Sequence, residues 1–149
     1  MFLQILMLGL MLVFSNVMPV VAEEITEEQK EVAAEKINAG IEASKQWLAI
    51  VDEGQYEKSW NEAAQLFKDK VPSGQWETSL NQIRTPLGKV HSREVLQYQY
   101  LTSVPGAPKG EFVVIQFKTS FEQKPDSVET ITPMLDSDGQ WRVSGYYIK

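Results

Sequence analysis

The sequence predicts an α+β domain in which three N-terminal helices pack on a curved, four-stranded antiparallel meander sheet. Up to about Gly88, apolar residues recur at steps of three and four, which is the spacing of one face of a helix. Beyond Gly88 the spacing changes to two, as in a half-buried strand. Helices that precede the strands, rather than alternating with them, favour a helical layer on one face of the sheet.

The first helix is predicted to begin at Thr26. Thr26 and Gln29 have the spacing of a capping box, and acidic residues occupy the first turn, where the helix dipole favours them. Gly54 suits the position after the helix, where a left-handed backbone ends it. The apolar stripe of this helix comprises Ala33, Ile37, Ile41, Ser44, Leu48 and Val51.

A second helix is predicted over residues 56–69, and a third begins at Ser73 and closes at Gly88. Pro86 lies in the last turn of the third helix and weakens it, because proline has no backbone N–H. The connections are short, so the helices must pack against each other or against one shared surface. The two stripes are Tyr56, Trp60, Ala63 and Phe67, then Trp76, Leu80, Ile83 and Leu87.

Residues 103–110 separate the first two strands and contain two Pro and two Gly, which indicates a long hairpin loop. Pro133 indicates that the third strand lies at an edge or carries a bulge. Long, bent strands that close over helices form a cone, and its mouth is where a ligand would bind. The four predicted strands cover residues 89–102, 111–121, 127–135 and 140–149.

The first 22 residues predict a signal peptide that is cleaved after Ala22. They contain no charged side chain, and Val20 and Ala22 are small residues at the spacing of a cleavage site. The apolar run Ile5–Phe14 is short for a membrane span, which needs about 20 residues. Because no Lys or Arg precedes this run, an uncleaved membrane anchor is the alternative. We therefore expect a periplasmic or secreted protein with one domain over residues 23–149 and no stable membrane span after cleavage.

The composition excludes several kinds of function. A net charge of −6 argues against nucleic-acid binding, which needs a basic surface. The absence of cysteine excludes disulfides, thiolate metal sites and cysteine nucleophiles. Asp136 and Asp138 stand in a turn that lacks the remaining ligands of a calcium loop, and no G-x-S-x-G motif is present. We expect no metal, no cofactor and no catalytic residue.

Three basic side chains surround the junction between the third helix and the first strand. His91 is the only histidine, and we expect it to be exposed and without a catalytic role, because a general base needs a positioned partner. Arg84 and Arg93 are candidate anion contacts. The alternative is that Arg84 complements a helix C-terminus and Arg93 pairs with a carboxylate across the sheet.

Six aromatic side chains are candidates for lining a ligand cavity, although packing in the core is the alternative for them. The strand carboxylates Glu94, Glu111 and Glu129 are expected to point outward. The aromatic candidates are Trp47, Trp60, Trp76, Tyr98, Phe112 and Trp141.

Four stretches carry a family resemblance: "LAIVDEGQYEKSWNEAA", "RTPLGKVHSRE", "PGAPKGEFVVIQFKTSFEQK" and "WRVSGYYIK". Through them the chain, from about Ala33 to Lys149, resembles the bacterial domain-of-unknown-function family DUF4019. The resemblance implies an exported bacterial protein with a cone-shaped fold similar to nuclear transport factor 2 and scytalone dehydratase. It implies no activity and transfers no catalytic residue.

These observations predict a non-catalytic binding or interaction module. Its ligand would be a small apolar molecule or a protein partner, bound at the mouth or on the outer face of the sheet. One alternative is a small enzyme of the isomerase or dehydratase type, with an ionisable residue inside the cone. Another is a homodimer in which two sheets pack face to face.

Overall fold

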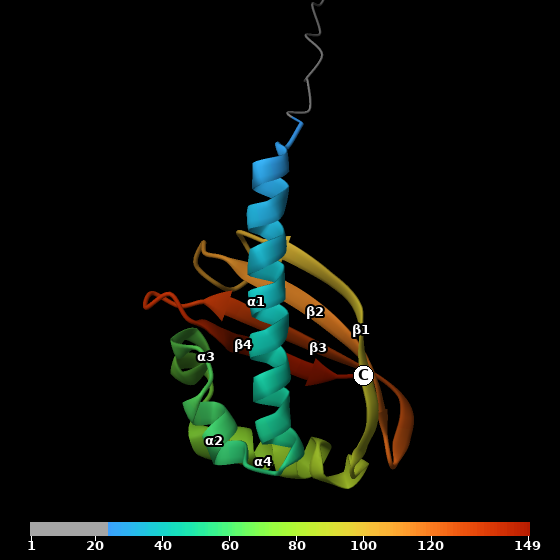
Figure 1. The fold of residues 1–149 in the computed structure, drawn as a ribbon. Coiled ribbons are helices and arrows are strands. Elements are labelled where there is room, and N and C mark those ends of the chain that lie inside the picture. The colour runs from blue at the N-terminus through green and yellow to red at the C-terminus, as the bar shows by residue number, and fades with distance from the viewer. Residues whose placement is uncertain (1–23) are drawn as a thin grey trace, which may run out of the picture.

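The computed structural model describes residues 24–149, so the predicted signal peptide lies outside the described part (Figure 1). The helices precede the strands, which confirms the α+β class. The elements are α1 (Glu27–Asp52), α2 (Tyr56–Asn61), α3 (Gln65–Lys70), α4 (Ser73–Ile83), a 3-10 turn (Thr85–Leu87), β1 (Val90–Leu101), β2 (Phe112–Phe121), β3 (Lys124–Leu135) and β4 (Trp141–Ile148).

The four strands form one antiparallel sheet in the order β1-β2-β3-β4, which is the predicted meander. Helix α1 crosses one face of the sheet, and α2 and α4 lie at the C-terminal end of α1 (Figure 1). We call the opposite face of the sheet the outer face. Within residues 24–149, no helix is long and apolar enough to cross a membrane.

Local signals set both ends of α1 as predicted. The Thr26 hydroxyl accepts from the Gln29 amide at 3.2 Å, and the Gln29 side chain accepts from the Thr26 amide at 2.7 Å, which completes the capping box. Gly54 follows the helix with φ of 74°, a conformation that costs glycine little.

Residues 24–149 form four α-helices rather than three, because the predicted helix over 56–69 is broken. Ala64 has an extended backbone, and its amide donates to the carbonyl of Val143 in β4 at 2.8 Å. A bond to the sheet thus replaces a bond within the helix, and the chain divides into α2 and α3. Helix α4 also ends earlier than expected, at Ile83, and Pro86 lies in the 3-10 turn that follows.

The sheet departs from the prediction in two details. Strand β3 begins at Lys124 instead of 127, because a tight hairpin pairs Lys124 with Phe121. Pro133 lies in this inner strand, where the register with β4 shifts between Thr132 and Pro133. Of the two alternatives predicted from Pro133, the structure therefore shows the bulge, and it lies in a strand that is not an edge.

Packed side chains fill the space between α1 and the sheet. Trp47 of α1 lies 5.9 Å from Trp76 of α4 and 5.3 Å from Tyr146 of β4, measured between ring centroids. Phe67 of α3 meets Trp76 edge-on at 5.0 Å. The sheet contributes fully buried aliphatic and aromatic residues from its two inner strands, namely Val113, Ile115, Phe117 and Ile131.

Candidate functional site

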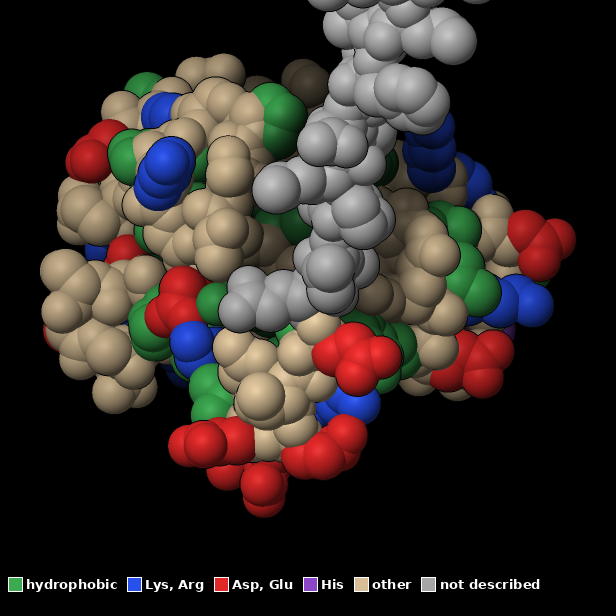
Figure 2. Space-filling model, turned by 90° about the horizontal axis from the view of Figure 1, so that it is seen from above, with side chains coloured by type: hydrophobic (Ala, Val, Ile, Leu, Met, Phe, Trp, Pro, Cys, Tyr) green, Lys and Arg blue, Asp and Glu red, His purple; other side chains and the backbone are tan. Residues whose placement is uncertain are grey.

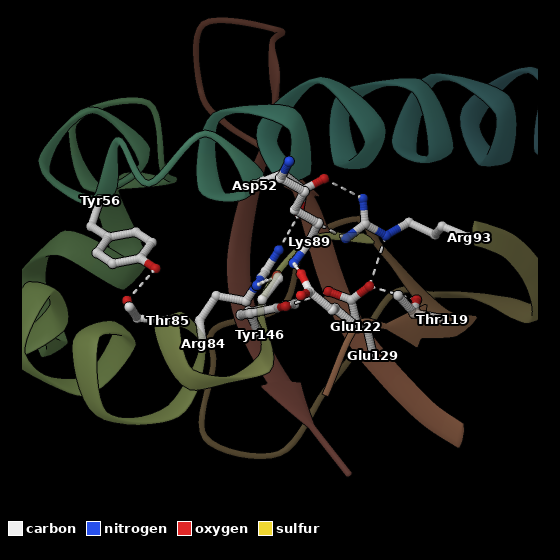
Figure 3. Close-up of polar contacts among 11 residues, drawn as sticks. Asp52, Tyr56, Arg84, Thr85, Lys89, Arg93, Thr119, Glu122, Glu129 and Tyr146 are labelled. Atoms are coloured by element: carbon white, nitrogen blue, oxygen red, sulfur yellow. Dashed lines mark hydrogen bonds and ion pairs between the residues drawn. The ribbon is translucent and has the colours of Figure 1, made fainter. Parts of the chain in front are cut away.

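Two carboxylates and two guanidiniums meet where the C-terminal end of α1 packs on the sheet, and they extend from fully buried Glu129 to exposed Asp52 (Figure 3). Asp52 is the last residue of α1, Arg84 caps the C-terminus of α4, Arg93 lies in β1 and Glu129 lies in β3. We call these four residues the ionic cluster. They come from elements far apart in the sequence, so the cluster exists only once the helices have packed on the sheet.

Glu129 is fully buried, and the expectation that it points outward is wrong. Its register partners are Phe117 in β2 and Ile148 in β4, so its side chain lies on the face covered by α1. The charge is tolerated because donors surround it. Arg93 Nε donates to Oε1 at 2.7 Å, Thr119 Oγ1 donates to the same oxygen at 2.6 Å, and the Tyr146 hydroxyl donates to Oε2.

Asp52 joins the two arginines. Arg93 donates to both of its oxygens, from Nη1 at 2.7 Å and from Nη2 at 3.0 Å, in a bidentate pair. Arg84 Nη2 donates to Asp52 at 3.2 Å, and its Nη1 donates to the Gly88 carbonyl at 2.7 Å. The Arg84 guanidinium also lies 4.6 Å from the centre of the Phe121 ring. The cluster therefore contains two charges of each sign.

Two pKa shifts reflect this environment. Burial raises the pKa of Tyr146 well above its ordinary value, and the neighbouring Glu129 carboxylate raises it further. Burial by itself would lower the pKa of Arg93, but its bonds to Asp52 and the attraction of Glu129 outweigh that effect and raise it. At neutral pH Tyr146 thus stays a neutral donor and Arg93 stays charged.

The structure brings Arg84 and Arg93 together on one anion, and that anion is the Asp52 carboxylate of the protein itself. The structural roles predicted as the alternative to anion binding are both observed. Arg84 stands at the C-terminus of α4, and Arg93 pairs with the Glu129 carboxylate across β2. His91 is exposed, as expected, at a register shift in β1 between Val90 and Ser92.

The other two strand carboxylates differ from Glu129. Glu94 is exposed, as expected. Glu111 is partly buried and accepts from Lys36 of α1 and, at 2.7 Å, from the Tyr100 hydroxyl. Lys36 and, to a smaller extent, Tyr100 lower the pKa of Glu111.

The six aromatic candidates do not share one cavity. Trp47 and Trp76 belong to the core, and half-buried Trp60 packs against it and donates its indole N–H to the Val71 carbonyl at 2.7 Å. Tyr98 is 54% exposed on β1. The remaining two, Phe112 and Trp141, line separate surface pockets.

The first surface pocket lies between α1 and β4 and has a volume of about 240 Å³. Trp47 and Trp141 form part of its wall, with Ile50 and Val143. Its rim is polar and includes Arg142, which Asp136 and Asp138 hold through ion pairs. This pocket is consequently better suited to a polar molecule than to an apolar one.

The second surface pocket, which we call the loop pocket, lies between α3, the loop 103–110 and the outer face of the sheet. Its volume is about 310 Å³, and Lys70 of α3 donates to the Gly106 carbonyl of the loop at its border. Phe112 is fully buried and lines the pocket. Most of the other lining side chains are apolar, among them Leu66, Leu101, Val104, Ala107 and Val114.

Residues 24–149 contain no group of three or more His, Asp or Glu side chains placed to hold a metal ion. The helices and strands define a small α+β domain with a meander sheet, and the ionic cluster lies where α1 and the turn after α4 meet that sheet. The chain belongs to the DUF4019 family, described as a protein of unknown function, whose family model matches residues 43–146. The family resemblance is thereby confirmed, and the match includes all four residues of the ionic cluster. No curated protein matches the chain.

Sequence reasoning gave no role to Asp52 and expected Glu129 to point outward. One signal was available for Glu129, because strand alternation places it on the same side as Ile131, which faces the core. No comparable signal marks Asp52, since a carboxylate at the end of an amphipathic helix is usually solvated.

Proposed function

We propose that this protein is an exported bacterial binding module that holds a small apolar ligand in the loop pocket. The observation that carries the proposal is the apolar lining of this pocket on the outer face of the sheet, with Phe112 beneath it. Ligand sites are concave and mostly apolar, and volumes of about 300 Å³ lie at the lower end of their range. A single small ring or a short branched chain matches that size.

The ionic cluster supports binding rather than catalysis. A general acid or base must reach the substrate, and the Glu129 carboxylate is fully buried and already accepts bonds from Arg93, Thr119 and Tyr146. The packed aromatic residues between α1 and the sheet support the same view. An enzyme of the isomerase type would need an ionisable group facing an open chamber.

We also propose that the domain has a cone fold and that the protein is exported. The order of helices and meander strands supports a cone fold of the kind found in nuclear transport factor 2. The uncharged first 22 residues, with small residues at Val20 and Ala22, support export with cleavage after Ala22. Mass spectrometry of the protein recovered from the periplasm or medium should give an N-terminus at Glu23, whereas retention in the membrane fraction would favour the anchor.

Binding to the loop pocket can be measured by NMR titration with a neutral probe of a single ring, toluene. The variant Val114→Phe extends a side chain into the pocket, and we expect it to weaken probe binding about tenfold, as one or two lost apolar contacts would. The control is Gln116→Phe, two residues along β2 on the same face and outside the pocket lining. Equal affinity of both variants, or no probe binding by the parent protein, would refute the proposal.

A further inference from the structure

Strand β1 is an edge of the described sheet, and it exposes large apolar side chains. Val95 is 36% exposed, and Leu96 and Tyr98 are each 54% exposed. An edge strand also presents backbone N–H and C=O groups that no neighbour uses, which makes it a template for a further strand. Proteins usually place charges at such an edge, but residues 95–101 carry none.

The order of residues in this segment is suited to pairing with itself. Leu96-Gln97-Tyr98-Gln99-Tyr100 has the same pattern of apolar and polar positions in both directions. If two copies pair antiparallel about Tyr98, Leu96 meets Tyr100 of the partner subunit and Gln97 meets Gln99 of the partner subunit. Apolar side chains then face apolar ones, and amides face amides, as a two-fold axis requires.

Charge also favours this edge over other parts of the surface. The chain has a net charge of −6, so two copies repel one another wherever their acidic surfaces meet. Acidic side chains gather along one margin of the face seen in Figure 2. The N-terminal half of α1 alone exposes Glu27, Glu28, Glu31 and Glu35. The uncharged segment of β1 avoids this repulsion.

We propose that the protein forms a homodimer in which β1 pairs antiparallel with β1 of a second copy about Tyr98, joining two four-stranded sheets into one. This arrangement is independent of the loop pocket. It also differs from face-to-face packing of two sheets, because the contact is the edge of β1 and the outer faces stay free.

The length of the contact makes the dimer weak and reversible. The register of β1 with β2 shifts at Val90/Ser92 and at Val95/Gln97, where Leu96 has no partner in β2, so the segment that can pair about Tyr98 runs only from the bulge at Leu96 to Tyr100. Five paired residues extend about 17 Å. An interface of that length falls at the low end of specific interfaces, below about 1,200 Å² in total, where transient complexes lie. We expect a dissociation constant on the order of 10 μM.

Sedimentation velocity over a range of concentrations tests the proposal in protein purified after expression of the full chain. Tyr98→Lys places two like charges on the two-fold axis, and we expect it to weaken the dimer at least about 100-fold. The control is Tyr147→Lys, because Tyr147 is equally exposed but lies on the outer face of β4. A parent protein that stays monomeric at millimolar concentration would overturn the proposal. So would a dimer that Tyr147→Lys disrupts and Tyr98→Lys leaves intact, which would indicate face-to-face packing.

A cross-link gives a second, positive test, because the chain has no cysteine of its own. Tyr98→Cys brings two thiols to the axis, where opposed Cβ atoms of paired strands lie about 5 Å apart and can form a disulfide. Mild oxidation should give a covalent dimer of Tyr98→Cys and little of Tyr147→Cys. Equal yields from both variants would contradict the proposed pairing.

Discussion

Glu129 shows how a single residue depends on its neighbours in this fold. A buried carboxylate is costly unless it is paired and hydrogen-bonded, and here three donors from three different strands surround it. The same arrangement makes Arg93 dependent on Glu129, since the guanidinium is itself largely buried.

Glu129→Gln should therefore destabilise the protein strongly. The change keeps the shape of the side chain but removes one of the two carboxylate charges that balance Arg84 and Arg93, and breaking one partner of a buried pair typically costs about 3–5 kcal/mol. Urea unfolding followed by Trp fluorescence measures this difference in the free energy of unfolding. Glu94→Gln, at an exposed position of β1, is the control and should change the stability by less than about 0.5 kcal/mol. Similar stabilities of the two variants would show that the ionic cluster contributes little.

At the scale of elements, the contact between α1 and the sheet depends on a glycine. A Cβ atom on Gly40 would lie 3.0 Å from Cγ2 of Val113 in β2 and 3.3 Å from Cγ of Pro133 in β3. The missing side chain lets the helix backbone approach the inner strands closely. Glycine weakens the middle of a helix, so its presence in α1 reflects packing rather than helix propensity.

Gly40→Val should lower the free energy of unfolding by about 2 kcal/mol, because the added side chain overfills a packed interface. Thermal unfolding followed by circular dichroism measures the effect. Gly74→Val is the matched control, since a Cβ atom at Gly74 of α4 meets nothing within 4 Å. Unchanged stability of the Gly40 variant would mean that α1 can move away from the sheet without loss.

At the scale of the whole molecule, the buried tyrosine couples stability to alkaline pH. The pKa of Tyr146 is raised in the folded state above the unfolded value of about 10, so the folded protein holds this proton more tightly. The resulting stability is fully present below pH 10 and is lost as the pH rises toward the folded pKa. Partly buried Tyr100 has a raised pKa as well and acts in the same direction.

We expect the urea midpoint to fall above pH 10 together with the appearance of tyrosinate absorbance. Tyr146→Phe removes the ionisable group, so its midpoint should fall less steeply between pH 10 and 11 than that of the parent protein. Tyr147→Phe is the control, because Tyr147 is exposed. Equal slopes for all three proteins would contradict the coupling.

Features that depend on residues close in the sequence were predicted correctly, and features that depend on distant residues were not. Thr26, Gly54 and the Pro133 bulge are set by neighbours within a few residues, and the structure confirmed them. The division of residues 56–69 into two helices depends on a carbonyl of Val143, far away in β4. The apolar residues of 56–69 keep their helical spacing on both sides of Ala64, so the sequence pattern did not reveal that the helix is broken there.

The sequence by itself determined the class of fold, the order of helices and strands, and membership of the DUF4019 family. These follow from apolar spacing and local backbone preferences, which act over one or two turns. Only the tertiary structure decided that Asp52, Arg84, Arg93 and Glu129 meet in one cluster and that the six aromatic candidates separate. Contacts of that kind join residues more than thirty positions apart, and their partners become defined only when helices and sheet pack together.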